Sequence, residues 1–210
     1  MNYMARELGI WEIVILALLR EASMHPYQMQ GLLRLRHKDE ILVLKPGSLY
    51  HAIARLARAG LIAVRTTGRD GKRPERTIYR ITPGGRTELM KAIRSMVTTP
   101  RRESSEFMAA MSLLVYLDPH EAAPRLKERL QRLETEVAQL TAGLASASVD
   151  VARINLIESE YLLSMRKAEL AWVKALEKEI RSGKLAWDLK AILREAAAAR
   201  NATDNRRKKP

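Results

Sequence analysis

Residues 45–62, KPGSLYHAIARLARAGLI, have the pattern of a short helix with two different faces. Pro46 suits the first turn of a helix, and Gly60 suits the left-handed residue that follows its end. One face is apolar at helical spacing through Leu49, Ile53 and Leu56. The other face carries hydroxyl, imidazole and guanidinium groups, so we expect it to lie against a polar partner while the apolar face is buried.

The segments around this helix predict a small helical unit with a hairpin. A helix is expected over ELGIWEIVILALLREAS (7–23), and a second one begins at Pro26. Residues 61–66 and 76–81 are rich in β-branched residues and are separated by Asp-Gly and Pro, which predicts a β-hairpin. A Thr-Pro pair directly after the second strand resembles the cap and first residue of a fourth helix. This order is that of a winged helix-turn-helix.

The net charge of +13 is unevenly distributed along the chain. Residues 1–100 hold 17 Lys and Arg against 8 Asp and Glu, whereas residues 101–205 hold 16 of each kind and the terminal RRKK adds the rest of the excess. A basic region beside a neutral one favours a polyanionic partner for the first, although a basic surface also aids solubility.

The two-faced helix and the basic hairpin together predict DNA binding. A major groove admits one α-helix, which needs a buried apolar face and an opposite face with donors for bases and phosphates. A charged turn by itself is more often a solvated surface feature. The predicted DNA contacts lie in the helix and at the hairpin tip: Lys45, Ser48, Tyr50, His51, Arg55, Arg69, Lys72 and Arg73.

The second half of the chain predicts a different, all-helical unit. An apolar stripe through 107–115 predicts one helix, and the Asp-Pro pair at 118–119 resembles the start of a long one. Leucines then recur at steps of four and three, as in a coiled coil. Pro124 predicts either a kink or a helix that begins near this residue, and we favour the kink. A further long helix is expected from Ile154 to about Ser182.

Two long amphipathic helices with little else to bury them imply a partner pair of helices, most economically from a second copy of the chain. A small-molecule pocket is the alternative use of Tyr161 and Trp172, and no effector-binding residue is assigned. The residues expected at the dimer interface are Leu126, Leu130, Leu133, Val137, Leu140, Ile157, Tyr161, Met165 and Trp172.

No catalytic, metal, cofactor or membrane site is predicted. The chain has no cysteine, and its four histidines are scattered without carboxylates at metal-ligand spacing. Ser48 lacks the second glycine of a nucleophile elbow, so we do not expect an enzyme. The longest apolar run, 13–19, is too short to span a bilayer, and Glu7 and Glu12 interrupt the segment where a signal peptide would lie. A cytoplasmic location is therefore expected.

Three motifs resemble the PadR family of bacterial transcriptional regulators. MHPYQMQGLL (24–33), KPGSLYHAIARLARAGLI (45–62) and RPERTIYRITPGGRTEL (73–89) are similar to that family's second helix, recognition helix and wing, in this order. The C-terminal helices resemble, more loosely, the long dimerisation region of one branch of the family. The resemblance implies a homodimer that binds an inverted repeat in a promoter, usually as a repressor, and releases it when an effector is sensed.

The sequence thus predicts a mainly α fold with an N-terminal winged helix-turn-helix, a two-stranded β wing and a C-terminal all-helical dimerisation domain. The expected boundaries are 1–98 for the DNA-binding domain, 104–200 for the dimerisation and possible effector domain, and 202–210 for a disordered basic tail. The expected function is a sequence-specific DNA-binding repressor released by a small molecule. The alternative is a helical dimeric scaffold whose winged domain binds a protein partner.

Overall fold

The computed structural model describes residues 7–36, 38, 47–68, 76–101, 105–195 and 198. The chain forms two compact units, Met1–Arg102 and Glu103–Pro210, which we call the winged unit and the helical unit. The predicted tail at 202–210 lies outside the described residues. The predicted fold class, a winged helix-turn-helix followed by an all-helical region, is confirmed.

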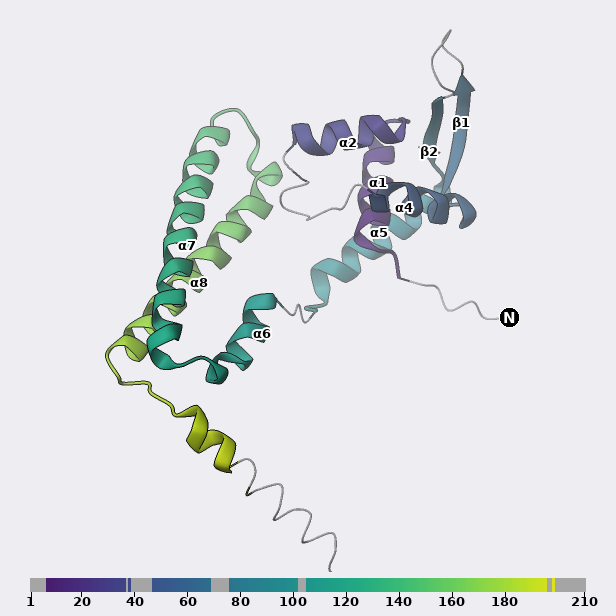
Figure 1. Ribbon diagram of the computed structural model, residues 1–210. Helices are drawn as coiled ribbons and strands as arrows, with labels where there is room; N and C mark the ends of the chain where they lie inside the picture. Colours follow the sequence, from purple (N-terminus) through teal and green to yellow (C-terminus); the bar gives the residue numbers. More distant parts are fainter. Residues whose placement is uncertain are drawn as a thin grey trace, which may run out of the picture. The chain divides into compact units, whose positions relative to one another are not determined.

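The winged unit contains four labelled helices and one hairpin (Figure 1). The helices α1 and α2 are followed by α4, and the strands β1 and β2 then lead into α5. The bounds are Ile10–Glu21 for α1, Pro26–Leu35 for α2, Gly47–Arg58 for α4, Ile62–Gly68 for β1, Arg76–Ile81 for β2 and Pro83–Thr98 for α5.

Local chemistry explains where these elements begin and end. His25 caps α2, because its Nδ1 accepts a hydrogen bond from the Tyr27 N–H at 3.1 Å. Thr82 caps α5 by accepting from the Gly85 N–H at 3.1 Å. Gly60, just after α4, has φ +68°, a conformation that side chains other than glycine rarely adopt.

The two strands are antiparallel and joined to the rest of the unit at their base. Ile62 pairs with Ile81 and Val64 with Tyr79, and the register shifts between Val64 and Thr66, as in a β-bulge. The backbone of Tyr79 also exchanges two hydrogen bonds of 3.1 Å with Met24, which lies in the turn between α1 and α2. The hairpin is therefore attached to the first two helices as well as to its own strands.

One continuous apolar core holds the winged unit together. Helix α1 packs against α4, α5 and β2, and α4 also packs against β1. The stripe predicted for α4 faces this core. The largest fully buried side chains of the unit are Ile15, Leu16, Met29, Leu49, Leu56 and Leu89.

The helical unit is built around two long helices that pack side by side (Figure 1). A short helix and a single 3-10 turn precede them, and another 3-10 turn connects them. The bounds are Glu106–Ser112 for α6, Leu114–Tyr116 for η1, Pro119–Ala147 for α7, Arg153–Asn155 for η2 and Ile157–Arg181 for α8. Residues 189–195 are also helical.

Two expected helix boundaries in this unit are wrong. The stripe at 107–115 does not form one helix, because α6 ends at Ser112 and a 3-10 turn follows. Ile154 lies in the 3-10 turn before α8 and not in the long helix. Helix α7 begins at Pro119, where the Asp118 carboxylate accepts from the His120 N–H at 2.8 Å, and it continues through Pro124.

Candidate nucleic-acid interface

Helix α4 has the two faces that its sequence predicts. Its buried face consists of Leu49, Ala52, Ile53 and Leu56. On the other face Tyr50 is 56% exposed, and His51 is exposed as well. Ser48, in the first turn, is half-buried. The core thus holds the helix by one side and leaves an aromatic hydroxyl and an imidazole directed away from that core.

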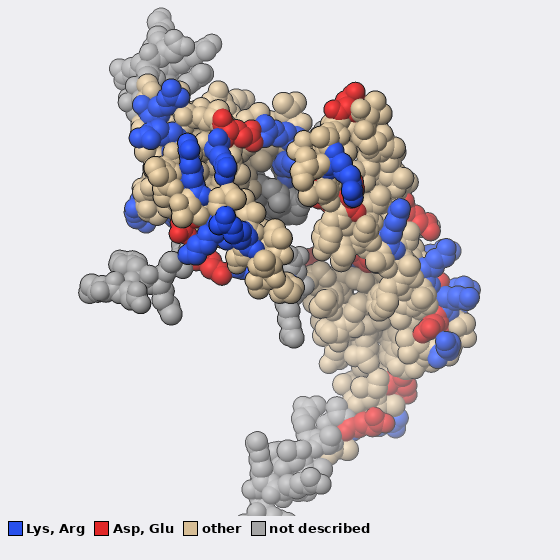
Figure 2. All heavy atoms as spheres, turned by 180° about the vertical axis from the view of Figure 1, so that it is seen from behind, with Lys and Arg blue, Asp and Glu red and all other residues tan. Residues whose placement is uncertain are grey.

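Basic side chains extend from α4 onto the hairpin. Arg58 in the last turn of α4 and Arg65 and Arg80 on the two strands are exposed. Figure 2 shows Lys and Arg side chains gathered on the winged unit. These three arginines were not among the predicted contacts, although their position beside or within predicted elements was visible in the sequence. The predicted contacts Lys45, Arg69, Lys72 and Arg73 lie outside the described residues.

Arg55 differs from the other predicted contacts because it already has a partner within the chain. Its Nε donates to the Glu12 Oε1 at 2.7 Å. The Arg55 side chain is 36% exposed, whereas that of Glu12 is 6% exposed. In the sequence, Glu12 stands out only as an interruption of an apolar segment, because nothing local connects it with a residue 43 positions later.

The residues expected at a dimer interface fall into three groups. Leu126, Leu130 and Leu133 are buried inside the helical unit, where they pack with Val173 and Ile180 of α8. Val137 and Leu140 are half-buried. On α8 the side chains of Ile157, Tyr161, Met165 and Trp172 are about half exposed or more. The first group serves the core of a single chain, and the last group is open to a partner.

A groove of about 660 Å³ lies in the helical unit between α6, η1 and α7. Its lining combines apolar residues, including Met111, Leu114 and Leu126, with several arginines. The Arg129 guanidinium stacks over the Phe107 ring at 3.6 Å from the ring centroid. Phe107 in turn meets Trp172 edge-on, with ring centroids 6.1 Å apart.

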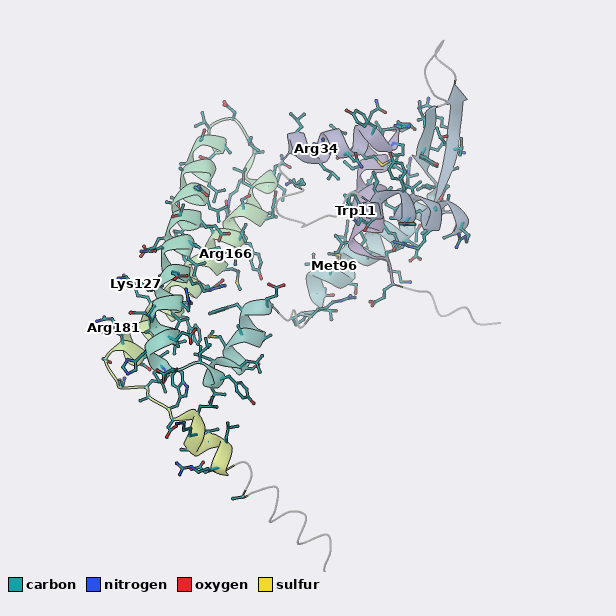
Figure 3. The ribbon with its side chains drawn as sticks, in the orientation of Figure 1. Trp11, Arg34, Met96, Lys127, Arg166 and Arg181 are labelled. Atoms are coloured by element: carbon teal, nitrogen blue, oxygen red, sulfur yellow. The ribbon has the colours of Figure 1, made fainter. Side chains whose placement is uncertain are left out.

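Two arginines of this groove form ion pairs between the long helices: Arg129 of α7 with Glu169 of α8, and Arg166 of α8 with Glu136 of α7. Arg166 extends from α8 toward α7, where its Nε donates to Glu136 at 2.8 Å (Figure 3). Hydrogen bonding to Glu136 raises the pKa of Arg166 above its ordinary value. Glu169 accepts from both Arg129 and Arg166. Arg132 has no carboxylate partner among the described residues, so it is the cation of the groove that is open to an anion.

The described part of the chain contains neither a metal-holding cluster nor a membrane-spanning helix. No group of three His, Cys, Asp or Glu residues there is placed to hold a metal ion. None of the described helices is long and apolar enough to cross a membrane.

Comparison with known proteins identifies the winged unit. Residues 15–91 match the family described as the transcriptional regulator PadR-like family. The match begins within α1 and spans α2, α4, both strands and the first half of α5. A search of curated protein sequences finds no match to the chain.

Solved structures with the same fold cover most of the chain. Bacillus subtilis PadR in complex with operator DNA is 19% identical, with 82% of this chain and 99% of that chain covered and a TM-score of 0.66. The same protein in complex with p-coumaric acid gives 18% identity, the same coverage and a TM-score of 0.64. The Vibrio cholerae virulence activator AphA is 17% identical over 82% of this chain and 98% of its own, with a TM-score of 0.60. These likenesses extend the shared fold into the helical unit.

Proposed function

Because residues 15–91 match the PadR-like family of transcriptional regulators, we propose that the chain is a regulator of this kind: a cytoplasmic repressor that binds an inverted-repeat operator as a homodimer. A small molecule releases it from DNA. The regulator class is not an enzymatic one. The observation that carries the proposal is helix α4, whose buried face is complete while Tyr50 and His51 are directed away from the core.

In this proposal α4 reads bases, and the hairpin tip and helix entrance hold phosphates. Ser48, Tyr50 and His51 offer hydroxyl and imidazole groups able to reach base edges in the major groove. Lys45, Arg69, Lys72 and Arg73 supply positive charge for the backbone, which fixes position without reading sequence. The exposed Arg65 and Arg80 on the strands between these groups support a continuous basic surface.

Dimerisation through the helical unit is supported by the apolar side chains that α8 leaves exposed. Ile157, Tyr161 and Met165 recur every four residues, and Trp172 follows after seven. This spacing places them along one side of the helix. A second copy of the chain would cover this row and bring two copies of α4 to one operator.

Release by a small molecule is supported by the groove beside Phe107. Its volume is within the range of ordinary ligand sites, and it combines an apolar floor with the unpaired Arg132. A relative of the same fold is known in complex with p-coumaric acid, an aromatic carboxylic acid. We propose that an aromatic carboxylate binds in the groove of this chain.

The test is a titration of the full chain against two duplexes at two salt concentrations. One duplex is selected by the unmodified chain from a randomised pool, and the other is of mixed sequence. We expect affinity for both to fall steeply with salt, because DNA binding releases counterions. If the full chain binds neither duplex but binds a protein partner tightly and independently of salt, the scaffold alternative is favoured.

Two sets of variants separate base reading from phosphate contact. Tyr50→Ala or His51→Ala should weaken binding to the selected duplex by roughly 1–3 kcal/mol and change mixed-sequence binding little. Tyr27→Ala is the control, since Tyr27 is an exposed tyrosine of the same unit on α2.

Neutralising Arg69, Lys72 and Arg73 should weaken binding to both duplexes and flatten the salt slope by roughly 0.9 per contact. Neutralising Lys127, Lys174 and Lys190 is the matched control.

A further inference from the structure

Glu12 is a buried charged side chain of the winged unit that the proposed DNA contacts do not use. It is 4% exposed and lies near the start of α1, next to Trp11, which Figure 3 labels. Its neighbours on the same side of the helix, Ile15 and Leu16, are fully buried. A carboxylate in such surroundings is strongly unfavourable unless charged or polar partners satisfy both of its oxygens.

Both oxygens of Glu12 have such partners, and the partners belong to different elements. Oε2 accepts from the Gly9 N–H at 2.6 Å, which closes the N-terminus of α1. Oε1 accepts from the Arg55 Nε at 2.7 Å. Arg55 lies in the last turn of α4, where a cation also interacts favourably with the helix dipole. One carboxylate therefore connects the beginning of α1 to the end of α4.

This connection bears directly on the face of α4 that we propose reads DNA. His51 is one helical turn before Arg55 on the same side of α4. Recognition of base edges requires side chains held to within about 0.5 Å, which a helix fixed only by apolar contacts achieves less well. A charged hydrogen bond of defined geometry at its last turn removes sliding and rotation of the helix on the core.

We propose that Glu12 is a positioning residue for DNA recognition, acting through Arg55. It holds the last turn of α4 on α1 and, by engaging the guanidinium, keeps that charge from a DNA phosphate. Arg55 is then a strut of the recognition helix and not one of its DNA contacts. This inference rests on the proposed function of α4.

The winged unit offers a control for the change of charge alone. Glu7 accepts from the Arg101 Nη2 at 2.8 Å, and both side chains are well exposed. Glu7→Gln makes the same change of charge in the same unit as Glu12→Gln. It releases Arg101, which lies beyond the end of α5, and leaves the contact between α1 and α4 intact.

The experiment titrates full-length Glu12→Gln and Glu7→Gln against the selected and the mixed-sequence duplexes. For Glu12→Gln we expect the ratio of the two affinities to fall about tenfold or more, because α4 is less well placed. The salt slope should steepen by roughly 0.9, because the released Arg55 gains a phosphate. Glu7→Gln should preserve both quantities. Parental selectivity and slope in Glu12→Gln, or equal changes in both variants, would overturn the proposal.

Arg55→Gln removes the other partner of the Glu12–Arg55 ion pair, so it tests the same proposal and remains informative if Glu12→Gln does not fold. A strut predicts lower selectivity with an unchanged salt slope, and reselection should show the loss spread over all base pairs read by α4. A phosphate contact predicts a slope flatter by roughly 0.9, and a base contact predicts loss at one position. Either of these two results would contradict the proposal. Adding Glu12→Gln to Arg55→Gln should lower selectivity no further.

The unmodified chain distinguishes a failure of this inference from a failure of the proposed function. If it shows no salt-dependent binding to either duplex, the proposed function is wrong. If it binds as expected and the Glu12 and Arg55 variants behave like the parent, only the positioning role is wrong.

Discussion

The two units of the chain use apolar helix faces in different ways. In the winged unit, short helices and the base of the hairpin surround a core in which Ile15, Leu16 and Leu49 are fully buried. In the helical unit, α8 buries Val173 and Ile180 against α7 but leaves Tyr161 and Trp172 more than half exposed. The winged unit also leaves apolar side chains such as Leu35 and Val97 exposed, but in the helical unit several exposed apolar side chains lie along one side of a single helix, α8.

The difference follows from geometry. Several short elements crossing at different angles can surround a core, whereas α7 and α8 pack mainly against each other, with further contacts from α6 through Phe107 and Met111. Charge divides along the same boundary, because the excess of Lys and Arg within residues 1–205 falls in 1–100. We propose a polyanion as the partner of the winged unit and an apolar partner for the helical unit, and the following predictions test that contrast.

The largest effect is expected from separating the units. A fragment of residues 1–100 should fold but be monomeric, and its DNA affinity should fall by roughly 10²- to 10⁴-fold, because two tethered readers gain from high effective concentration. Sedimentation and DNA titration measure both properties. Inserting about five base pairs between half-sites should abolish tight binding by the full chain only. A dimeric fragment would contradict the contrast.

The next effect tests how closely the start of α5 packs on the backbone at Leu61. A Cβ on Gly85 would lie 2.1 Å from the Leu61 carbonyl oxygen, so α5 must move away from the chain before β1. Gly85→Ala should destabilise this unit by about 3 kcal/mol. Gly84→Ala is the control, because its Cβ would meet only atoms at 3.8 Å or more. Calorimetry of both variants measures the loss, and similar melting temperatures would show that the helix start adapts.

In the helical unit, buried and exposed apolar residues should respond differently. Leu133→Ala should cost about 2 kcal/mol, near the lower end of the usual range because Leu133 borders the groove and solvent can fill the space. This loss should not depend on protein concentration. Met165→Ala should lower the melting temperature only through weaker self-association, so its effect should vary with concentration. Concentration-independent loss in both variants would place Met165 in the core of a single chain.

The smallest effect concerns an exposed ion pair of the winged unit. Arg36 donates to both carboxylate oxygens of Glu21, and this hydrogen bonding lowers the pKa of Glu21 below its ordinary value. Because the folded pKa is the lower one, the pair stabilises the fold above the pKa of Glu21 in the unfolded chain and loses this contribution as the pH falls through the folded pKa. Both groups are largely exposed, so the contribution is well under 1 kcal/mol. Glu21→Gln should remove this pH dependence in acid titrations of stability.

The sequence alone determined the order of elements and many of their limits. Helix starts at Pro26 and Pro119, and the helix end marked by Gly60, depend on backbone preferences and caps within a few residues. The two faces of α4 follow in the same way from helical spacing. The exceptions are the end of α6 at Ser112 and the start of α8 at Ile157. At both places the apolar residues keep their helical spacing although the α-helix is interrupted by a 3-10 turn.

Only the tertiary structure decided which of two equivalent patterns is buried. Leu130 and Met165 both lie in apolar stripes on long helices, yet one is inside the unit and the other is largely exposed. The link from Glu12 to Arg55 was likewise invisible, because it joins residues far apart in the chain. Periodicity defines a face but not the element that covers it, since that depends on how distant helices pack together.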